Sequence, residues 1–294
     1  MTIHIEPLTS HFGARVTGFC IRESLSDKDF AMIELAANQY GILVMPDQLL
    51  NNEQQIQFSE RMGRLEETLV GAVGAGSKIV RVSNVLPDGS IKDPDGQLAM
   101  FTRANFLWHT DSSFKARPAM FSLLSARELP SQGGGDTEFV STAAAFNALS
   151  EAEQSRLGNL IAIHSIAHSR EKSQPGSSSE EQQKRLPPVP QALVRTNPVT
   201  GQKSLYLASH VMGIQGMLAN EGLALHDKLL ELATAPEKVY RHKWSPNDLV
   251  LWDNRATMHR AMPYDESGDR RVMIRTTISD FGPTIVDGAI AAAA

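Results

Sequence analysis

The sequence has a single cysteine, Cys20, among its 294 residues. One cysteine cannot form a disulfide within the chain, and it excludes a zinc site built from several cysteine thiolates. Such sparing use of cysteine is typical of proteins in a reducing compartment. We therefore expect a cytoplasmic protein.

Long apolar runs and long basic runs are also missing. No stretch approaches the ~18 apolar residues of a membrane-spanning helix, so no membrane partner is expected. The first residues, Met-Thr-Ile-His-Ile-Glu, lack the charged and then apolar pattern of a secretion signal. The formal net charge is −5 and there is no basic stripe, so no nucleic-acid partner is expected. A small anionic ligand is not excluded, because a pocket can be locally positive.

The composition is that of an ordinary globular protein, with 41% hydrophobic and 21% charged residues. The length is ample for a large buried core. The sequence shows no internal repeat and no linker that would divide it. We therefore expect a single domain over residues 1–294.

Helix and strand signals follow one another along the chain. Ser26 and Gly41 bound an amphipathic stretch, which predicts a helix, and Gly41–Met45 reads as a buried strand. Asn52, with Gln55 at the capping-box position, predicts the start of a second helix. Further strands are expected at 79–83, 121–125, 193–196, 204–207 and 248–252, and further helices at 150–160 and 219–234.

Segment 171–190 has almost no large apolar side chains. Such composition predicts a surface loop, which we interpret as a lid. Elsewhere, many short strands accompanied by a few helices favour a β-sandwich or jelly roll with helical additions.

The most informative residues for function are His109 and Asp111, with His259 far downstream. On a strand His109 and Asp111 would share one face, since side chains alternate with a period of two. Two imidazoles and one carboxylate on one face of a metal, with open positions opposite, suit a non-haem Fe(II) oxygenase. Trp108 and Phe114 flank the pair with apolar bulk, where ionisable groups need a partner or a metal.

Other histidines offer a weaker alternative. His-x-Asp pairs occur by chance, and most of the nine histidines are expected to be structural or solvated. His164 and His168 would form a zinc pair if they lay on one helix. Residues 161–168 read equally as the end of a strand, and no glutamate occupies the position that such a zinc site requires.

Two arginines near the end of the chain are candidates for binding anions. Arg271 and Arg275 are separated by an even number, so a strand would turn both to one side, and planar guanidinium groups suit carboxylates. The apolar residues 272–274 indicate burial on both faces, and a buried arginine needs an anionic partner. A solvated edge face is the alternative. Gly133–Gly135 lacks the pattern of a phosphate loop and is interpreted as a turn that delivers Thr137 into a pocket.

Five blocks of sequence, taken in order, resemble the taurine dioxygenase/TfdA family of Fe(II)- and 2-oxoglutarate-dependent dioxygenases. The likeness spans nearly the whole length, and the order and spacing of the blocks together are highly specific. The blocks are Leu107–Phe114, Gly134–Phe139, Trp252–Arg255, Met258–Arg260 and Arg270–Arg271. This resemblance implies an α+β fold with a double-stranded β-helix core (jelly roll, cupin-like) and flanking helices.

The resemblance also implies the cofactors and their binding residues. His109, Asp111 and His259 match the ligands of Fe(II) in this family. Thr137 and Arg271 match the residues that bind 2-oxoglutarate, the co-substrate that is consumed with O2.

The implied reaction hydroxylates a C–H bond of a small anionic organic acid, a phenoxyacetate-like carboxylate or a sulfonate, and gives succinate and CO2. Residues that match substrate-facing positions are Arg275, Asn105, Ser113 and His210. Gly213 stands where a further histidine is expected, and the glycine-rich stretch Thr68–Gly76 has no lysine where one is expected. The sequence therefore predicts the class of substrate and not the compound.

Two other functions remain open. The same iron centre could serve a biosynthetic oxygenase that carries out desaturation or cyclisation of an amino-acid-like substrate. The chain could also be a non-enzymatic jelly-roll binding module with a vestigial metal site, although the retained set of predicted ligands argues against it. Members of the family are often dimers or tetramers, so we expect a homo-oligomer.

Overall fold

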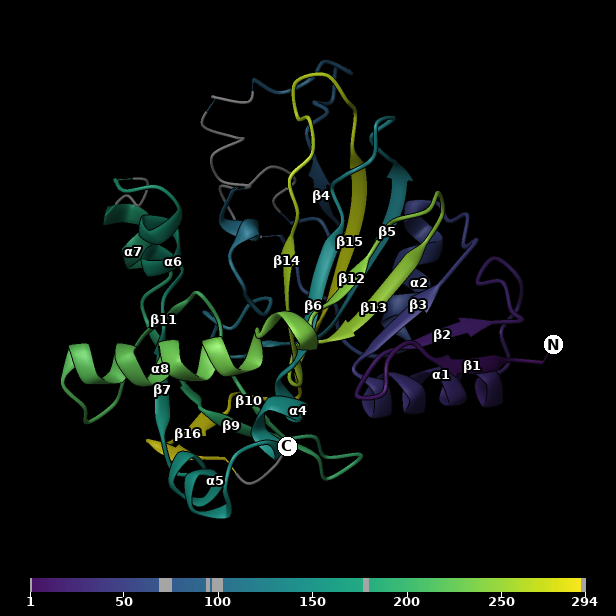
Figure 1. Ribbon diagram of the computed structural model, residues 1–294. Helices are drawn as coiled ribbons and strands as arrows, with labels where there is room; N and C mark the ends of the chain where they lie inside the picture. The colour runs from purple at the N-terminus through teal and green to yellow at the C-terminus, as the bar shows by residue number, and fades with distance from the viewer. Residues whose placement is uncertain (1, 69–75, 94–95, 97–102, 177–179, 292–294) are drawn as a thin grey trace.

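The structure is a computed structural model, and it describes residues 2–68, 76–93, 96, 103–176 and 180–291. Its largest element is a seven-stranded sheet of order β1-β2-β3-β13-β5-β15-β4 (Figure 1). Neighbouring strands are antiparallel except for the parallel pair β2 and β3. The strands are β1 (His4–Pro7), β2 (Ala14–Thr17), β3 (Ile42–Met45), β13 (Leu249–Asp253), β5 (Ala119–Glu128), β15 (Val272–Ser279) and β4 (Val80–Ser83).

A three-stranded sheet packs against the large one. Its order is β12-β6-β14, with β12 (Tyr240–His242), β6 (Thr137–Ser141) and β14 (Thr257–Ala261). The ring of Phe139 on β6 lies 5.7 Å from the ring of Trp252 on β13, and Leu124 and Met273 belong to the same buried cluster. The two sheets therefore share one apolar layer, and burial of that layer stabilises their contact.

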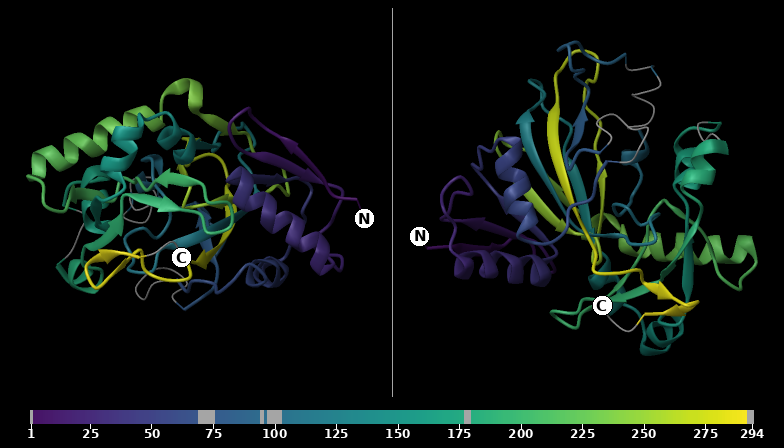
Figure 2. Two further views of the ribbon diagram at one scale, coloured as in Figure 1. Left: turned by 90° about the horizontal axis from the view of Figure 1, so that it is seen from below. Right: turned by 180° about the vertical axis from the view of Figure 1, so that it is seen from behind.

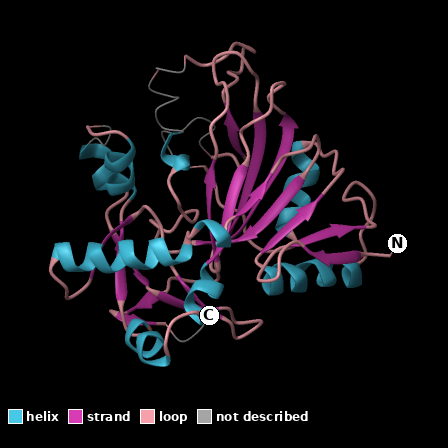
Figure 3. Cartoon of the chain, in the orientation of Figure 1, coloured by secondary structure: helices cyan, strands magenta, loops and turns pink. Residues whose placement is uncertain are grey.

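Smaller sheets and the later helices form the other end of the molecule. Helices α6, α7 and α8 lie away from α1 and α2 in both views of Figure 2. Figure 3 distinguishes the helices, in cyan, from the strands, in magenta. The sheets are β11-β7-β8, β10-β9 and β16-β17, with β7 (Ile161–His164), β8 (Val189–Ala192), β9 (Val194–Thr196), β10 (Lys203–Leu205), β11 (Val211–Ile214), β16 (Ile285–Val286) and β17 (Ala289–Ile290). The helices are α1 (Asp27–Tyr40), α2 (Asn52–Glu60), α4 (Thr142–Asn147), α5 (Glu151–Leu157), α6 (Ile166–Ser173), α7 (Glu180–Arg185), α8 (Ala219–Ala233) and the short 3-10 turns η1 (Ala104–Phe106) and η2 (Pro236–Lys238).

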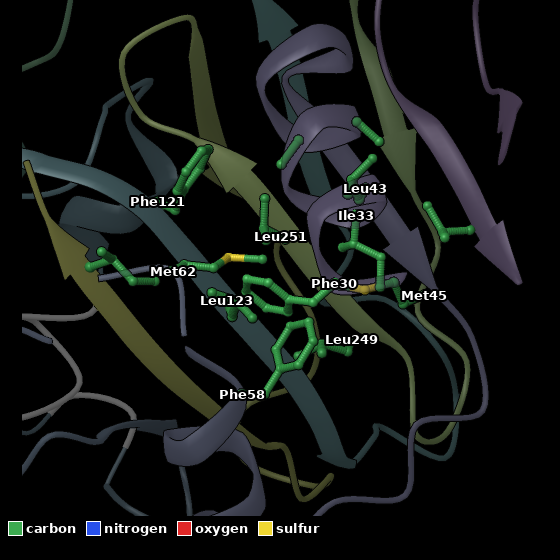
Figure 4. Packing of buried hydrophobic residues seen from close by; sticks show 14 of the residues in the cluster. Phe30, Ile33, Leu43, Met45, Phe58, Met62, Phe121, Leu123, Leu249 and Leu251 are labelled. Carbon is green, nitrogen blue, oxygen red and sulfur yellow. The ribbon is translucent and has the colours of Figure 1, made fainter. Parts of the chain in front are cut away.

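The ends of α1 follow the predicted signals. The side chain of Ser26 accepts a hydrogen bond from the backbone N–H of Asp29, and Gly41 ends the helix with φ at 75°, a conformation that costs glycine little. Helix α1 then lays Phe30 and Ile33 over the large sheet, where they meet side chains of β3, β5 and β13 (Figure 4). The mixture of helices with several sheets confirms the expected α+β class.

The predicted start of α2 is wrong by one residue. The capping box is formed by Asn51 and Gln54, and not by Asn52 and Gln55. Gln55 is fully buried, and its amide nitrogen donates to the carbonyl of Ile274 on β15 at 2.9 Å. The neighbouring asparagine and glutamine therefore cap the helix, because tertiary contacts already occupy the side chain of Gln55.

The prediction of a loop over 171–190 is only partly correct. The segment contains the end of α6, the whole of α7 and the start of β8, while residues 177–179 lie outside the described part of the chain. The run Glu-Glu-Gln-Gln-Lys-Arg consists of good helix formers, which explains α7 without any need for apolar residues. Of the glycine-rich stretch Thr68–Gly76, residues 69–75 also lie outside the described part.

Among the helices that the structure describes, none combines the length and the apolar character needed to cross a membrane.

Candidate metal centre

The side chains of His109, Asp111 and His259 converge between the two sheets. One ligand atom from each lies within 4.8 Å of the others, and all three residues are buried. The prediction that His109 and Asp111 lie on a strand is wrong. His109 makes only an isolated β-bridge to His259, with N–H···O distances of 3.0 and 2.9 Å, and Asp111 begins the turn that follows. That bridge, rather than a strand period, brings the two histidines together.

Asp111 is fixed by neighbours that its sequence context did not reveal. Ser122 on β5 donates to its Oδ2 at 2.7 Å, and Arg275 on β15 donates to its Oδ1 at 2.6 Å. Asn254 accepts from the backbone N–H of Asp111 at 3.0 Å and donates to Ser122 Oγ at 3.0 Å. The indole N–H of Trp252 donates to the same side-chain oxygen, Oδ1 of Asn254, at 3.0 Å. The carboxylate therefore has one orientation before any metal binds.

A hydrogen bond orients the imidazole of His109, and ring packing orients that of His259. Nδ1 of His109 lies 2.8 Å from the carbonyl oxygen of Leu107, so this nitrogen carries the ring proton and leaves Nε2 for a metal. Nε2 of His259 lies 3.9 Å from Oδ2 of Asp111. The His259 ring packs on Trp252 and Phe139, with centroid distances of 4.6 and 6.0 Å.

The protonation states of the trio suit a cation. Burial lowers the pKa of His109 and of His259, so both imidazoles are neutral. Burial raises the pKa of Asp111, but the nearby Arg275 guanidinium and the hydrogen bond from Ser122 outweigh it and hold the pKa well below its usual range. Neutral imidazoles and an ionised carboxylate are the forms that bind metals. Donor set, burial and protonation therefore fit a ferrous ion with three protein ligands.

The prediction that Arg271 and Arg275 share a strand is wrong, because Arg271 is the residue before β15. It is nevertheless buried, and its Nη2 donates to the carbonyl oxygen of Gly135 at 2.9 Å, while Nε has no partner among the described residues. A Cβ at Gly135, where φ is +66°, would come within 2.7 Å of Nε, so glycine is required for this approach. A buried guanidinium with a free N–H is suited to an anionic ligand.

Thr137, at the start of β6, lies two residues beyond Gly135. The indole N–H of Trp244 donates to Thr137 Oγ1 at 3.1 Å, and indole nitrogen is a donor only. The hydroxyl of Thr137 thus accepts from Trp244 and keeps its own proton for another acceptor. Trp244 carried no signal in the sequence that linked it to this site.

The two arginines line separate cavities. Arg271 shares a cavity with Asn105, Lys92 and Tyr264. Arg275 shares another with Ser112 and Phe114, among other residues. Asn105, predicted to face the substrate, thus lines the same cavity as the predicted 2-oxoglutarate residue Arg271.

Ser113 and His210, both predicted to face the substrate, are buried and bonded to each other at 3.0 Å. The ring of His210 stands edge-on to His109, with a centroid distance of 6.3 Å.

The alternative zinc pair is not formed, because His164 ends β7 while His168 belongs to α6, so the two do not share a helix. Among the described residues, the trio of His109, Asp111 and His259 is the one cluster with metal-ligand spacing.

We expect the buried His164 to make the free energy of unfolding depend on pH. Burial lowers its pKa from 6.5 to about 3, so between these values the unfolded chain binds a proton that the folded chain does not. The free energy of unfolding therefore falls as pH falls through this window, and this group contributes about 2 kcal/mol of loss between pH 7 and pH 5. Urea unfolding of metal-free protein at both pH values measures it. His164→Asn is expected to lose less stability than the wild type, and an equal loss would contradict the prediction.

Comparisons with known proteins agree with this geometry. The family described as "Taurine catabolism dioxygenase TauD, TfdA family" matches residues 4–277. The chain belongs to the TauD/TfdA family.

Relatives within the TauD/TfdA family cover almost the entire chain. An alpha-ketoglutarate-dependent 2,4-dichlorophenoxyacetate dioxygenase from Cupriavidus pinatubonensis is 38% identical over 95% of this chain and 99% of its own length. An (S)-phenoxypropionate/alpha-ketoglutarate-dioxygenase from Sphingobium herbicidovorans is 36% identical over 94% of both chains. The crystal structure of AAD-2 in complex with Mn(II) and N-oxalylglycine is 40% identical, with a TM-score of 0.90 over 98% of this chain and 100% of that one. These findings confirm the resemblance drawn from the five sequence blocks.

Proposed function

We propose that this protein is an Fe(II)- and 2-oxoglutarate-dependent dioxygenase that hydroxylates a C–H bond of a small anionic organic acid, in the manner of phenoxyacetate. The observation that carries the proposal is the buried trio of two neutral imidazoles and one carboxylate. A bound iron would supply the oxidising chemistry, in which O2 oxidises the substrate C–H bond together with 2-oxoglutarate, and 2-oxoglutarate becomes succinate and CO2. The relatives named for phenoxyacetate and phenoxypropionate oxidation support the substrate class.

The residues of this chain bind and orient the reactants. His109, Asp111 and His259 would hold the iron through two imidazole nitrogens and one carboxylate. Thr137 and Arg271 bind the carboxylates of 2-oxoglutarate, with the hydroxyl proton and the free Nε described above. The substrate-facing residues are Arg275, Asn105 and His210, while the predicted residue Ser113 supports His210 through its hydroxyl at 3.0 Å.

The role of Arg275 follows from one hydrogen bond and one unused donor. Its Nη1 donates to Asp111, and its buried Nε has no partner in the part of the chain that the structure describes. Its side chain borders the cavity with Ser112 and Phe114. One guanidinium can thus hold an iron ligand and an organic anion at the same time. Phe114 adds an apolar wall suited to an aromatic or alkyl group.

The direct test is succinate formation by purified protein with Fe(II), 2-oxoglutarate and O2. We expect 2,4-dichlorophenoxyacetate, phenoxypropionate or an alkylsulfonate to stimulate succinate formation severalfold, and expect none without O2. Mass spectrometry of the product separates hydroxylation from desaturation or cyclisation. No O2-dependent succinate with any acid of the panel would overturn the proposal.

Arg271→Ala is expected to raise KM for 2-oxoglutarate roughly a hundredfold, because it removes a charge-assisted contact to the co-substrate carboxylate. Its effect on KM for the acid is expected to be small. Steady-state kinetics in each reactant measure the split, with the exposed neighbour variant Arg270→Ala as control. If Arg271→Ala changed only KM for the acid, the roles of Arg271 and Arg275 would be exchanged.

We further propose four properties of the whole molecule. The facing sheets around the trio support a double-stranded β-helix core of the jelly-roll type, and the shared apolar layer supports a single domain over residues 1–294. The family resemblance supports a homo-oligomer, either a dimer or a tetramer. The single cysteine supports a cytoplasmic location.

A further inference from the structure

The hydroxyl of Ser113 lies between two imidazoles. Its Oγ is 3.0 Å from Nδ1 of His210 and 3.0 Å from Nδ1 of His164. All three residues are buried, with Ser113 and His164 at 0% exposure. A serine hydroxyl has one proton, so it donates to one of these nitrogens and accepts from the other. The two rings therefore cannot carry their protons independently.

His164 decides which arrangement is adopted. Its ring stacks on Tyr206 at 5.5 Å, and its buried Nε2 has no hydrogen-bond partner among the residues that the structure describes. Burial lowers its pKa to about 3, so the ring is neutral and carries one proton. A buried N–H without an acceptor is rarer in native proteins than a buried acceptor without a donor. The proton therefore resides on Nδ1, which donates to Ser113 Oγ.

The consequence passes through Ser113 to His210. Because Ser113 accepts from His164, its own proton points to Nδ1 of His210. Nδ1 of His210 is then an acceptor, and the ring proton of His210 must be on Nε2. In the described part of the chain this Nε2 has no hydrogen-bond partner. It is also not one of the fully enclosed side-chain nitrogen and oxygen atoms that lack a partner. It belongs to the ring that stands edge-on to His109 and to Phe114.

We propose that His164 and Ser113 are positioning residues that fix His210 as an Nε2–H donor, aimed at an acceptor oxygen of the organic-acid substrate beside the metal centre. The pattern selects substrates with a carboxylate, sulfonate or ether oxygen at this position. It also assigns Ser113 a different role from direct substrate contact, since its hydroxyl is already used by two histidines. The identity of the acceptor rests on the proposed function, whereas the position of the proton does not.

The proton position can be measured without any turnover. Long-range ¹H–¹⁵N correlation spectra of the metal-free, ¹⁵N-histidine-labelled full chain distinguish the two neutral forms of each ring. His210→Gln and His164→Asn identify the two sets of signals by their loss. We expect His164 to be protonated at Nδ1 and His210 at Nε2. An Nδ1-protonated His210 would overturn the inference, whatever substrate the protein uses.

Variants test the chain of hydrogen bonds from His164 through Ser113 to His210, which we call the relay. His164→Asn keeps an N–H near the position of Nδ1, whereas His164→Leu and Ser113→Ala break the chain of hydrogen bonds. With 2,4-dichlorophenoxyacetate as probe, we expect both breaking variants to raise KM for the probe roughly tenfold or more and to leave KM for 2-oxoglutarate unchanged. We expect His164→Asn to keep KM for the probe near the wild-type value and His210 protonated at Nε2. Equal KM values for the probe in Ser113→Ala and wild type would refute the relay, while a wild type inert on every acid of the panel would refute only the proposed substrate class.

Discussion

Replacing His109 with alanine is expected to abolish metal binding and to lower 2-oxoglutarate turnover more than a thousandfold. A bound metal would stabilise the transition state by several kcal/mol, and no other group in the site can replace that contribution. Two ligands would remain, and the cavity left by the imidazole would admit water. Mn(II) binding by calorimetry and succinate formation measure the two effects.

The control for His109→Ala is a second buried histidine outside the trio. His226 on α8 has 0% exposure and bonds Asp227 at 3.1 Å, so His226→Ala removes the same side chain from an equally buried place. It is expected to retain Mn(II) binding. Circular dichroism is expected to show both variants folded. A His109→Ala protein that still binds Mn(II) with wild-type affinity would contradict the ligand assignment.

Arg255→Ala is expected to destabilise the fold by about 3–5 kcal/mol, because it leaves the carboxylate of Asp253 buried without its cation. The guanidinium is 2% exposed, donates to both oxygens of Asp253 at 2.8 and 2.7 Å, and reaches Asn38 Oδ1 at 2.7 Å. The loss corresponds to a fall of roughly 10 °C in Tm. Thermal unfolding of the metal-free protein measures it.

A matched surface pair provides the comparison for Arg255→Ala. Arg270 Nε also donates to a carboxylate, that of Glu128, at 2.8 Å, but both side chains are nearly half exposed. Water and salt screen this pair, so Arg270→Ala is expected to leave Tm almost unchanged. Equal shifts in Tm for the two variants would show that burial of the Asp253 pair does not matter.

The sequence predicted features whose causes are local or chemically distinctive. Ser26 and Gly41 bound α1 as expected, because a helix cap depends on the few residues beside it. His109, Asp111 and His259 could be picked out because few residue types bind iron, and the family blocks preserve their order. The geometry that joins them was predicted incorrectly, since a β-bridge between distant segments replaces the expected strand.

Residues that act through tertiary contacts gave no usable signal. Ser122 and Trp244 lie outside the five sequence blocks, and Asn254 lies in the block Trp252–Arg255 without any sign of its contact to Asp111. These roles arise only where the fold brings the three residues beside Asp111 and Thr137. The shift of the α2 cap has the same origin, because Gln55 is occupied by a carbonyl of β15. Hydrogen-bond partners far apart in sequence depend on strand register and tertiary packing, which local sequence patterns alone do not reveal.

The most direct test of the metal centre is a crystal structure of the protein with Mn(II) and N-oxalylglycine. We expect one metal ion bonded to Nε2 of His109, to the Asp111 carboxylate and to His259, with the analogue's carboxylate in contact with Arg271. An ion bound elsewhere, or bonded to fewer than these three side chains at full occupancy, would contradict it.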